Sequence, residues 1–399
     1  MKKFVSILAV VVLMVAMCFA FAACSNDETP DNPDDQNVTD TEGSFKVGAI
    51  YINSKNDTAG YTFKHHAGIT TAMENLGLDP ETDLVIVDEV PEDKEAVLTA
   101  CDTLVGAGCN IVFGISFGYI DAMEEAAAAY PEVIFSHATG YKSNDTNFNN
   151  YFGRIYQARY LAGIAAGLKS VELGNNNIGF VSAYGTEYAE TCSGINAFTL
   201  GAQSVNPDVQ VHVNLIGAWD NEELEKSLSQ DLIDTYDCCV IAQHCNSAQP
   251  QIVANDNGIF GCGYNSDMTI DAPKAHLTAP IWNWSVYYQL AIENAKDDPA
   301  NFIANVGNYY GGLAENFVDI SPLSDNCVAG TQAYIDAARA LIVSGDWDVF
   351  SGVKLSYNVA EDGVVTVNQT DAALVDTEGN EIVAAGGASV EDSVITGSM

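Results

Sequence analysis

Residues 110–137 read NIVFGISFGYIDAMEEAAAAYPEVIFSH, and this stretch decides the fold. Asn110–Ser116 is an apolar run with the length of a buried strand, and residues 119–130 form an alanine-rich segment typical of a helix that ends at Pro131. Val133–His137 is a second apolar run. A strand, a helix and a strand in this order predict a parallel βαβ unit.

The same alternation continues on both sides of this unit. Further strands are predicted at Lys46–Ile52, Leu84–Val90, 177–182, Val209–Ile216, Cys238–Gln243, Ile259–Tyr264 and Leu277–Ile281. Helices are predicted around Ile69–Leu76 and at 93–105, 156–169, 187–204, 221–236, 248–256 and 283–296. Two such runs predict two α/β lobes, each a doubly wound unit with its ligand crevice at the carboxyl ends of the strands. Beyond residue 355 the pattern weakens to one expected hairpin, Val364–Val367 with Glu381–Ala384, and a loose tail.

The N-terminal residues resemble an export signal. Lys2 and Lys3 precede the apolar segment 4–22, and small residues lead to Cys24 in the motif Phe21-Ala22-Ala23-Cys24. This motif resembles a bacterial lipobox, with Phe21 in place of the usual Leu. We therefore expect a signal peptide at 1–23, lipidation of Cys24 and an acidic tether up to residue 44. An uncleaved transmembrane anchor is the alternative, and both place the chain outside the cytoplasmic membrane.

Charge and composition exclude several classes of protein. The chain has 15 basic and 54 acidic residues among 399, a formal net charge of -39, so a nucleic-acid binder with a basic face is excluded. Its 48% hydrophobic residues are too many for a disordered acidic protein.

Cofactor and metal motifs are absent from the sequence. No G-x-G-x-x-G follows a strand, no Walker A sequence occurs, and the six histidines lack metal-ligand spacing. Eight cysteines remain after residue 24 without a C-x-x-C pair, and several lie in apolar strand-like runs, which favours buried thiols, with one or two disulfides as the alternative. We expect no cofactor and no metal.

Gly114-Ile115-Ser116-Phe117-Gly118 matches the G-x-S-x-G nucleophile elbow between a strand and a helix. In a secreted hydrolase Ser116 would attack, with Asp267 and His276 as partners. Because little sheet precedes the motif, we favour a glycine-flanked loop that lines a ligand cleft, and expect no catalytic residue.

Aromatic and polar side chains gather just beyond the predicted strand ends. The candidates for ligand binding are Tyr61, Thr62, Phe117, Asp121, His137, Tyr141, Trp219, Gln243, His244, Asn265, Asp267 and Trp282. Flat aromatic walls mixed with polar groups suit a planar small molecule, and both a nucleobase and a sugar ring are compatible.

Sequence motifs in order along the chain resemble the basic membrane protein family, the PnrA-like solute-binding lipoproteins of ABC transporters. The matching stretches are Lys46–Tyr51, Asp57–Gly68, Ile111–Asp121, Ser136–Lys142, Tyr151–Gly167, Gly194–Pro207, Gly217–Asp220, Val240–His244, Gly263–Met268, Lys274–Trp284 and Gly311–Ile320. The resemblance implies a type I periplasmic-binding-protein fold, with two doubly wound lobes joined by a three-crossover hinge. It also implies a purine base or nucleoside as ligand and an ABC permease as partner.

In the family, aromatic rings hold the base from its faces and polar side chains hold it at its edges. The matching motifs imply one of these two roles for each of Tyr61, Phe117, Asp121 and Trp219. Relatives that bind nucleosides carry an acid and a lysine toward the ribose, where this chain has Asn265 and Trp282. We therefore expect a bare purine such as adenine to be favoured. A sugar or autoinducer-type receptor of the same fold and a secreted hydrolase are the alternatives.

The expected domains are lobe 1 (45–154 and about 282–318), lobe 2 (155–281 and about 319–355) and an acidic C-terminal extension (356–399). We expect a lipid-anchored monomer on the outer face of the cell membrane.

Overall fold

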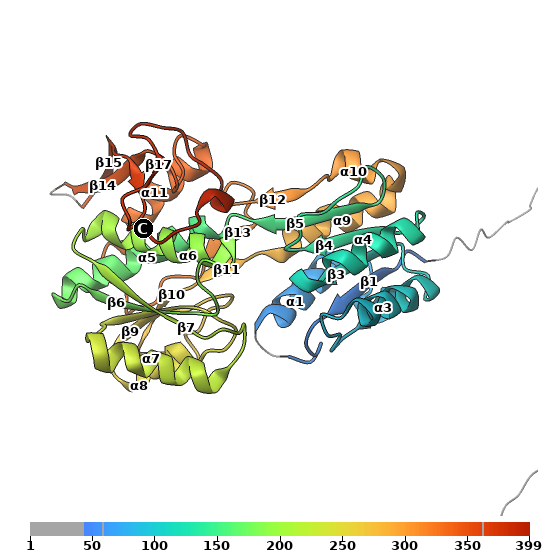
Figure 1. The fold of residues 1–399 in the computed structure, drawn as a ribbon, viewed down its shortest axis with the longest axis horizontal. Helices are drawn as coiled ribbons and strands as arrows, with labels where there is room; N and C mark the ends of the chain where they lie inside the picture. The colour runs from blue at the N-terminus through green and yellow to red at the C-terminus, as the bar shows by residue number, and fades with distance from the viewer. Residues whose placement is uncertain (1–43, 58–59, 361–362) are drawn as a thin grey trace, which may run out of the picture. The chain divides into compact units, whose positions relative to one another are not determined.

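The computed structural model describes residues 44–57, 60–360 and 363–399 (Figure 1). The expected signal peptide, Cys24 and nearly all of the acidic tether lie outside the described residues. Among the described helices, none is both long and apolar enough to span a bilayer.

The first sheet has six parallel strands in the order β12-β5-β4-β3-β1-β2. They are β1 (Val47–Tyr51), β2 (Leu84–Val87), β3 (Ile111–Ile115), β4 (Ile134–Ala138), β5 (Phe148–Gly153) and β12 (Tyr309–Gly311). Every residue of β1, β3 and β4 is buried, because a parallel sheet with helices on both faces has no wet side.

Helices cover both faces of this sheet (Figure 1). They are α1 (Gly60–Asn75), α2 (Pro80–Asp83), α3 (Lys94–Gly106), η1 (Phe117–Tyr119), α4 (Ile120–Ala129), α9 (Trp284–Asp297), η2 (Pro299–Asn301) and α10 (Phe302–Asn305). Alternate residues of β3 show the two faces. Phe113 packs in one cluster with α1 and α9, and Val112 packs in another with α3 and α4.

The second sheet has five parallel strands in the order β10-β9-β8-β6-β7. They are β6 (Asn177–Ser182), β7 (Gln210–Leu215), β8 (Val240–His244), β9 (Phe260–Cys262) and β10 (His276–Thr278). Its helices are α5 (Ile155–Leu173), α6 (Ala189–Val205), α7 (Glu222–Tyr236) and α8 (Gln249–Asp256). The apolar clusters place α5 and α6 on one face and α7 and α8 on the other.

Glycines allow α5 and α6 to pack very closely. A Cβ atom on Gly163 would lie 2.1 Å from the carbonyl oxygen of Phe198, and one on Gly201 would lie 2.1 Å from that of Tyr160. Both distances are far below van der Waals contact, so each position requires glycine. This contact fixes α6, whose first turn reaches the cavity described below.

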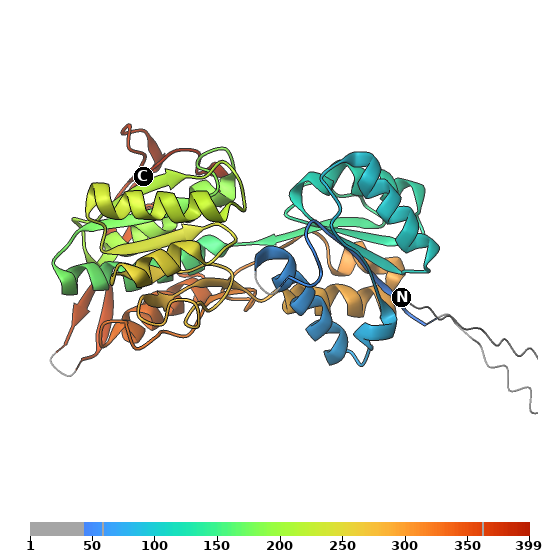
Figure 2. The same ribbon diagram turned by 90° about the horizontal axis from the view of Figure 1, so that it is seen from below.

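The chain crosses between the two sheets three times (Figure 2). The crossings follow β5, β11 (Pro280–Trp282) and β12, and β11 pairs antiparallel with β13 (Val318–Ile320). This arrangement is the predicted type I periplasmic-binding-protein fold with a three-crossover hinge. The single predicted strand Leu277–Ile281 is wrong, because β10 pairs with β9 in the second sheet and β11 pairs with β13.

The C-terminal part is more ordered than the sequence pattern indicates. It contains α11 (Thr331–Ser344), β14 (Val353–Val359), β15 (Val365–Asp371), β16 (Leu374–Val375), β17 (Glu381–Val383) and η3 (Asp392–Val394). The expected hairpin is wrong: β15 pairs with β14, and β17 pairs with β16. The tail is also not loose, since Ile395 is fully buried.

All eight cysteines after residue 24 are free thiols, and all except Cys327 are buried. Burial raises the pKa of Cys101 to about 12, as expected for a small apolar side chain inside a core. The prediction of buried thiols is confirmed.

Candidate functional site

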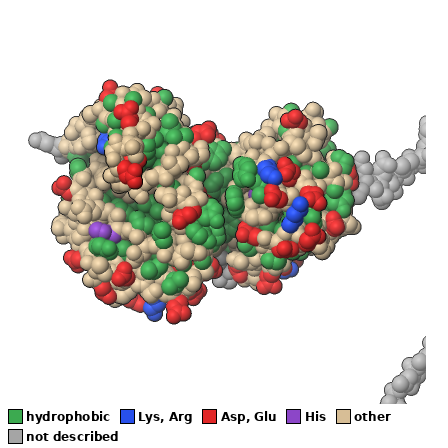
Figure 3. All heavy atoms as spheres, in the orientation of Figure 1, with side chains coloured by type: hydrophobic (Ala, Val, Ile, Leu, Met, Phe, Trp, Pro, Cys, Tyr) green, Lys and Arg blue, Asp and Glu red, His purple; other side chains and the backbone are tan. Residues whose placement is uncertain are grey.

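A cavity of about 760 Å³ lies at the carboxyl ends of strands from both sheets. Residues after β3 and β4 line one side, and residues after β8 and β9 line the other. Apolar side chains gather in the hollow between the two α/β units (Figure 3). Doubly wound units bind ligands at this position, so the cavity is the candidate site.

Seven of the twelve predicted site residues line this cavity. They are Tyr61, Phe117, Tyr141, Trp219, His244, Asn265 and Trp282. Aromatic rings missed in the prediction complete the walls: Phe152, Tyr188, Tyr264 and Tyr310. Tyr264 lies two residues beyond the end of β9, so its place just past a strand end is the signal that could have identified it.

Trp282 is held firmly in the wall. Its ring stacks on Trp284 with centroids 4.5 Å apart and an angle of 11°, and Phe152 lies 4.8 Å away. The indole Nε1 donates a hydrogen bond of 3.1 Å to the Tyr264 hydroxyl. Because Trp282 is only 6% exposed, it presents a fixed surface to the cavity.

Three of the other predicted residues lie outside the lining and have their own structural contacts. Asp121 forms an ion pair with Lys142 at 2.8 Å. His137 Nε2 lies 2.7 Å from the carbonyl oxygen of Ser116. Gln243 Nε2 donates 2.7 Å to the Ser247 carbonyl.

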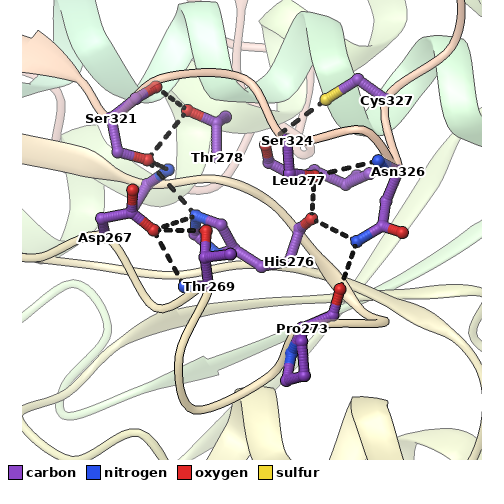
Figure 4. A network of polar contacts seen from close by, with 11 residues as sticks. Asp267, Thr269, Pro273, His276, Leu277, Thr278, Ser321, Ser324, Asn326 and Cys327 are labelled. Carbon is purple, nitrogen blue, oxygen red and sulfur yellow. Dashed lines mark hydrogen bonds and ion pairs between the residues drawn. The ribbon is translucent and has the colours of Figure 1, made fainter.

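Thr62 and Asp267 also lie outside the lining. Thr62 is fully buried in α1. Asp267 lies 3.4 Å from His276 in a polar network that includes Thr269 and Ser321 (Figure 4). The network joins the β9–β10 connection to the segment after β13.

The Ser116 contacts differ from those of a nucleophile elbow. Its Oγ donates a 2.5 Å hydrogen bond to Glu92 Oε1, and the Gly118 N–H donates to the same oxygen at 2.8 Å. Among residues 44–57, 60–360 and 363–399, no hydrogen bond joins Ser116 to His276. The glycine-flanked loop therefore binds a carboxylate at the cavity wall.

Glu190 is an acid of the cavity lining with two side-chain partners, and it is not among the residues predicted from the sequence. Its Oε1 accepts a 3.0 Å hydrogen bond from the Tyr264 hydroxyl and lies 3.3 Å from His244 Nε2. Burial favours the neutral acid, but His244 and the other partners outweigh it, so the pKa of Glu190 lies below its ordinary value. The carboxylate is therefore ionised at neutral pH.

A buried guanidinium lies behind this wall. Arg159 is 1% exposed, lies 4.1 Å from the Tyr264 ring centroid, and donates 2.6 Å to the Gln243 carbonyl. Burial and the Arg159 charge lower the pKa of His244, so its imidazole is neutral at neutral pH and donates to Glu190. Arg159 and Glu190 thus offset each other across Tyr264.

The described lining residues include five acids and no lysine or arginine. The acids are Glu92, Glu190, Asp220, Glu391 and Asp392. Such a cavity attracts N–H and O–H donors and repels phosphate groups, because no cation faces the ligand.

Residues 45–349 match the family described as ABC transporter substrate-binding protein, PnrA-like. The chain belongs to this family. It is therefore an extracytoplasmic ABC transporter substrate-binding protein, which works with a permease, and the family is not a family of enzymes. This confirms the resemblance stated from the sequence motifs.

Individual relatives agree with this assignment. The chain is 34% identical to a purine-binding protein of Brucella abortus over 311 residues, 78% of this chain and 84% of that protein. It is 32% identical to a Haloferax volcanii protein over 66% of this chain and 63% of that protein. The name of that protein proposes that it is an ABC transporter glucose-binding protein. A solute-binding protein structure from Aeropyrum pernix has a TM-score of 0.62 at 16% identity. The match covers 80% of this chain and 95% of that chain, and it supports the fold.

Proposed function

We propose that the chain binds a purine base or purine nucleoside between its two lobes and delivers it to an ABC permease. The aromatic cavity at the strand ends carries the proposal, since nucleobases stack on aromatic faces. The purine-binding relative from Brucella abortus supports it. The ligand would favour closure of the lobes because it contacts both lobes in the closed state.

We further propose that a bare purine is preferred over its nucleoside. Asn265 and Trp282 line the cavity at the positions where a ribose-binding acid and lysine would be expected. Trp282 is fixed by its stack on Trp284, so it takes up space instead of offering a charge to the ribose hydroxyls.

Calorimetric titration tests this preference directly. We expect adenine to bind about tenfold more tightly than adenosine, because the fixed Trp282 ring takes up the space that a ribose would need. Adenosine monophosphate should not bind, since the described residues of the lining include no lysine or arginine. Tighter binding of adenosine would contradict the base preference, and binding of glucose without any purine would contradict the purine proposal.

We also propose that lipid on Cys24 anchors a monomer to the outer face of the cell membrane. In a bacterial host fed radiolabelled palmitate, we expect the wild-type chain to carry label and Cys24→Ser to carry none. An unlabelled wild-type chain that stays in the membrane fraction would instead indicate an uncleaved anchor.

A further inference from the structure

The C-terminal end of the chain reaches the cavity. Glu391–Ser393 line it, together with residues from both sheets. The family match ends at residue 349, so this part of the wall comes from outside the matched residues.

Contacts on both sides hold this segment in place. Before it, the Val390 N–H donates 3.0 Å to the Phe350 carbonyl. After it, Ile395 is fully buried, and Asn196 of α6 donates 2.7 Å to the Gly397 carbonyl. The Met399 N–H donates 2.9 Å back to Asn196 Oδ1. The cavity-lining residues are therefore part of a fixed wall.

Asp392 is the buried acid of this segment. It is 7% exposed and lies beside the Tyr310 hydroxyl, which also lines the cavity. Burial and the nearby charge of Glu190 raise the pKa of Asp392, while Tyr310 opposes this shift. Two carboxylates from distant parts of the chain, Glu190 and Asp392, thus line the same cavity.

We propose that Asp392 is a specificity-determining residue of the binding site, and that its carboxylate accepts an N–H or O–H donor of the ligand. The Tyr310 hydroxyl and the Ser393 N–H donate to it, and the described lining has no lysine or arginine to add a charged donor. A carboxylate accepts several hydrogen bonds, so a ligand amino, imino or hydroxyl group completes its shell. This inference rests on the proposed function, because it assigns a contact within the same site.

The test compares full-length Asp392→Asn with wild-type protein by calorimetric titration of adenine and adenosine. Asparagine keeps the shape but loses the charge, so we expect the affinity for the tighter purine to fall about tenfold. The control Glu378→Gln also removes one acid from the C-terminal part, at an exposed position, and should bind as wild type does. Thermal unfolding confirms that each variant is folded, and unchanged affinity in folded Asp392→Asn would overturn the inference.

A second measurement needs no ligand and separates this inference from the purine proposal. Trp219 and Trp282 line the same cavity, so tryptophan fluorescence reports ions that enter. We expect caesium to quench the fluorescence of Asp392→Asn less than that of Glu378→Gln, and iodide to quench it more. The reason is that Asp392→Asn removes a negative charge from the cavity. If no purine binds the wild-type protein, the purine proposal fails, and equal quenching in the two variants would overturn the inference on its own.

Discussion

Replacing Glu190 by glutamine should lower the free energy of unfolding by about 2 kcal/mol and weaken purine binding at the same time. The change removes the carboxylate that offsets buried Arg159 and accepts from Tyr264. The loss should be below that of a fully buried ion pair, since the Glu190 side chain is 18% exposed. Binding should weaken because Tyr264 in turn holds Trp282 in the wall. Denaturant unfolding and calorimetric titration measure the two effects.

The stability loss should depend on pH. Because the folded-state pKa of Glu190 lies below its ordinary value, the ionised group stabilises the fold above that ordinary value, and the contribution is lost as pH falls through the folded-state pKa. The difference in free energy of unfolding between wild type and Glu190→Gln should therefore be largest at neutral pH and become smaller in acid. The exposed control Glu223→Gln should show no such gap. A gap independent of pH would contradict an ionised Glu190.

Strand positions in the body of the fold could be predicted because buried parallel strands are short apolar runs between helical segments. The run at β1 and those at β3 and β4 are examples, and all three are fully buried. The break at Ala279 could not be predicted, because it arises where the chain leaves β9 as a partner and pairs with β13 instead. The pairing of β15 with β14 was missed for the same reason, because the residues of a strand do not determine which other strand it pairs with.

The candidate site could be predicted in part, since parallel strands bring their carboxyl ends to one edge. The neighbours Gln243 and His244 show the limit of this argument. Successive side chains of a strand point to opposite faces, and only His244 lines the cavity. Which of the two faces the ligand depends on how the second sheet is packed. Glu190 and Asp392 were missed because tertiary packing of α6 and of the C-terminal end brings them to the cavity.

Replacing Trp219 by alanine should weaken binding of the preferred purine by about ten- to a hundredfold, because base–aromatic stacking contributes about 1–3 kcal/mol per base. Trp219 lies in the loop after β7, lines the cavity, and packs against Tyr184 and Tyr188 with centroids 5.0 and 5.4 Å away. It is partly exposed, so part of its ring is available to a ligand. Trp219→Phe should keep most of the affinity, since a smaller flat ring remains.

A matched control separates stacking from a general loss of stability. Trp347 is 6% exposed, donates 2.8 Å from Nε1 to the Val353 carbonyl, and is absent from the cavity lining. Trp347→Phe should therefore lower the unfolding temperature and leave purine affinity unchanged. Trp219→Ala should instead weaken purine binding and leave the unfolding temperature unchanged. If Trp219→Ala binds adenine as tightly as wild type while remaining folded, the base does not stack on this wall. The ligand would then lie against Trp282 and the neighbouring rings of Phe152 and Tyr264 instead.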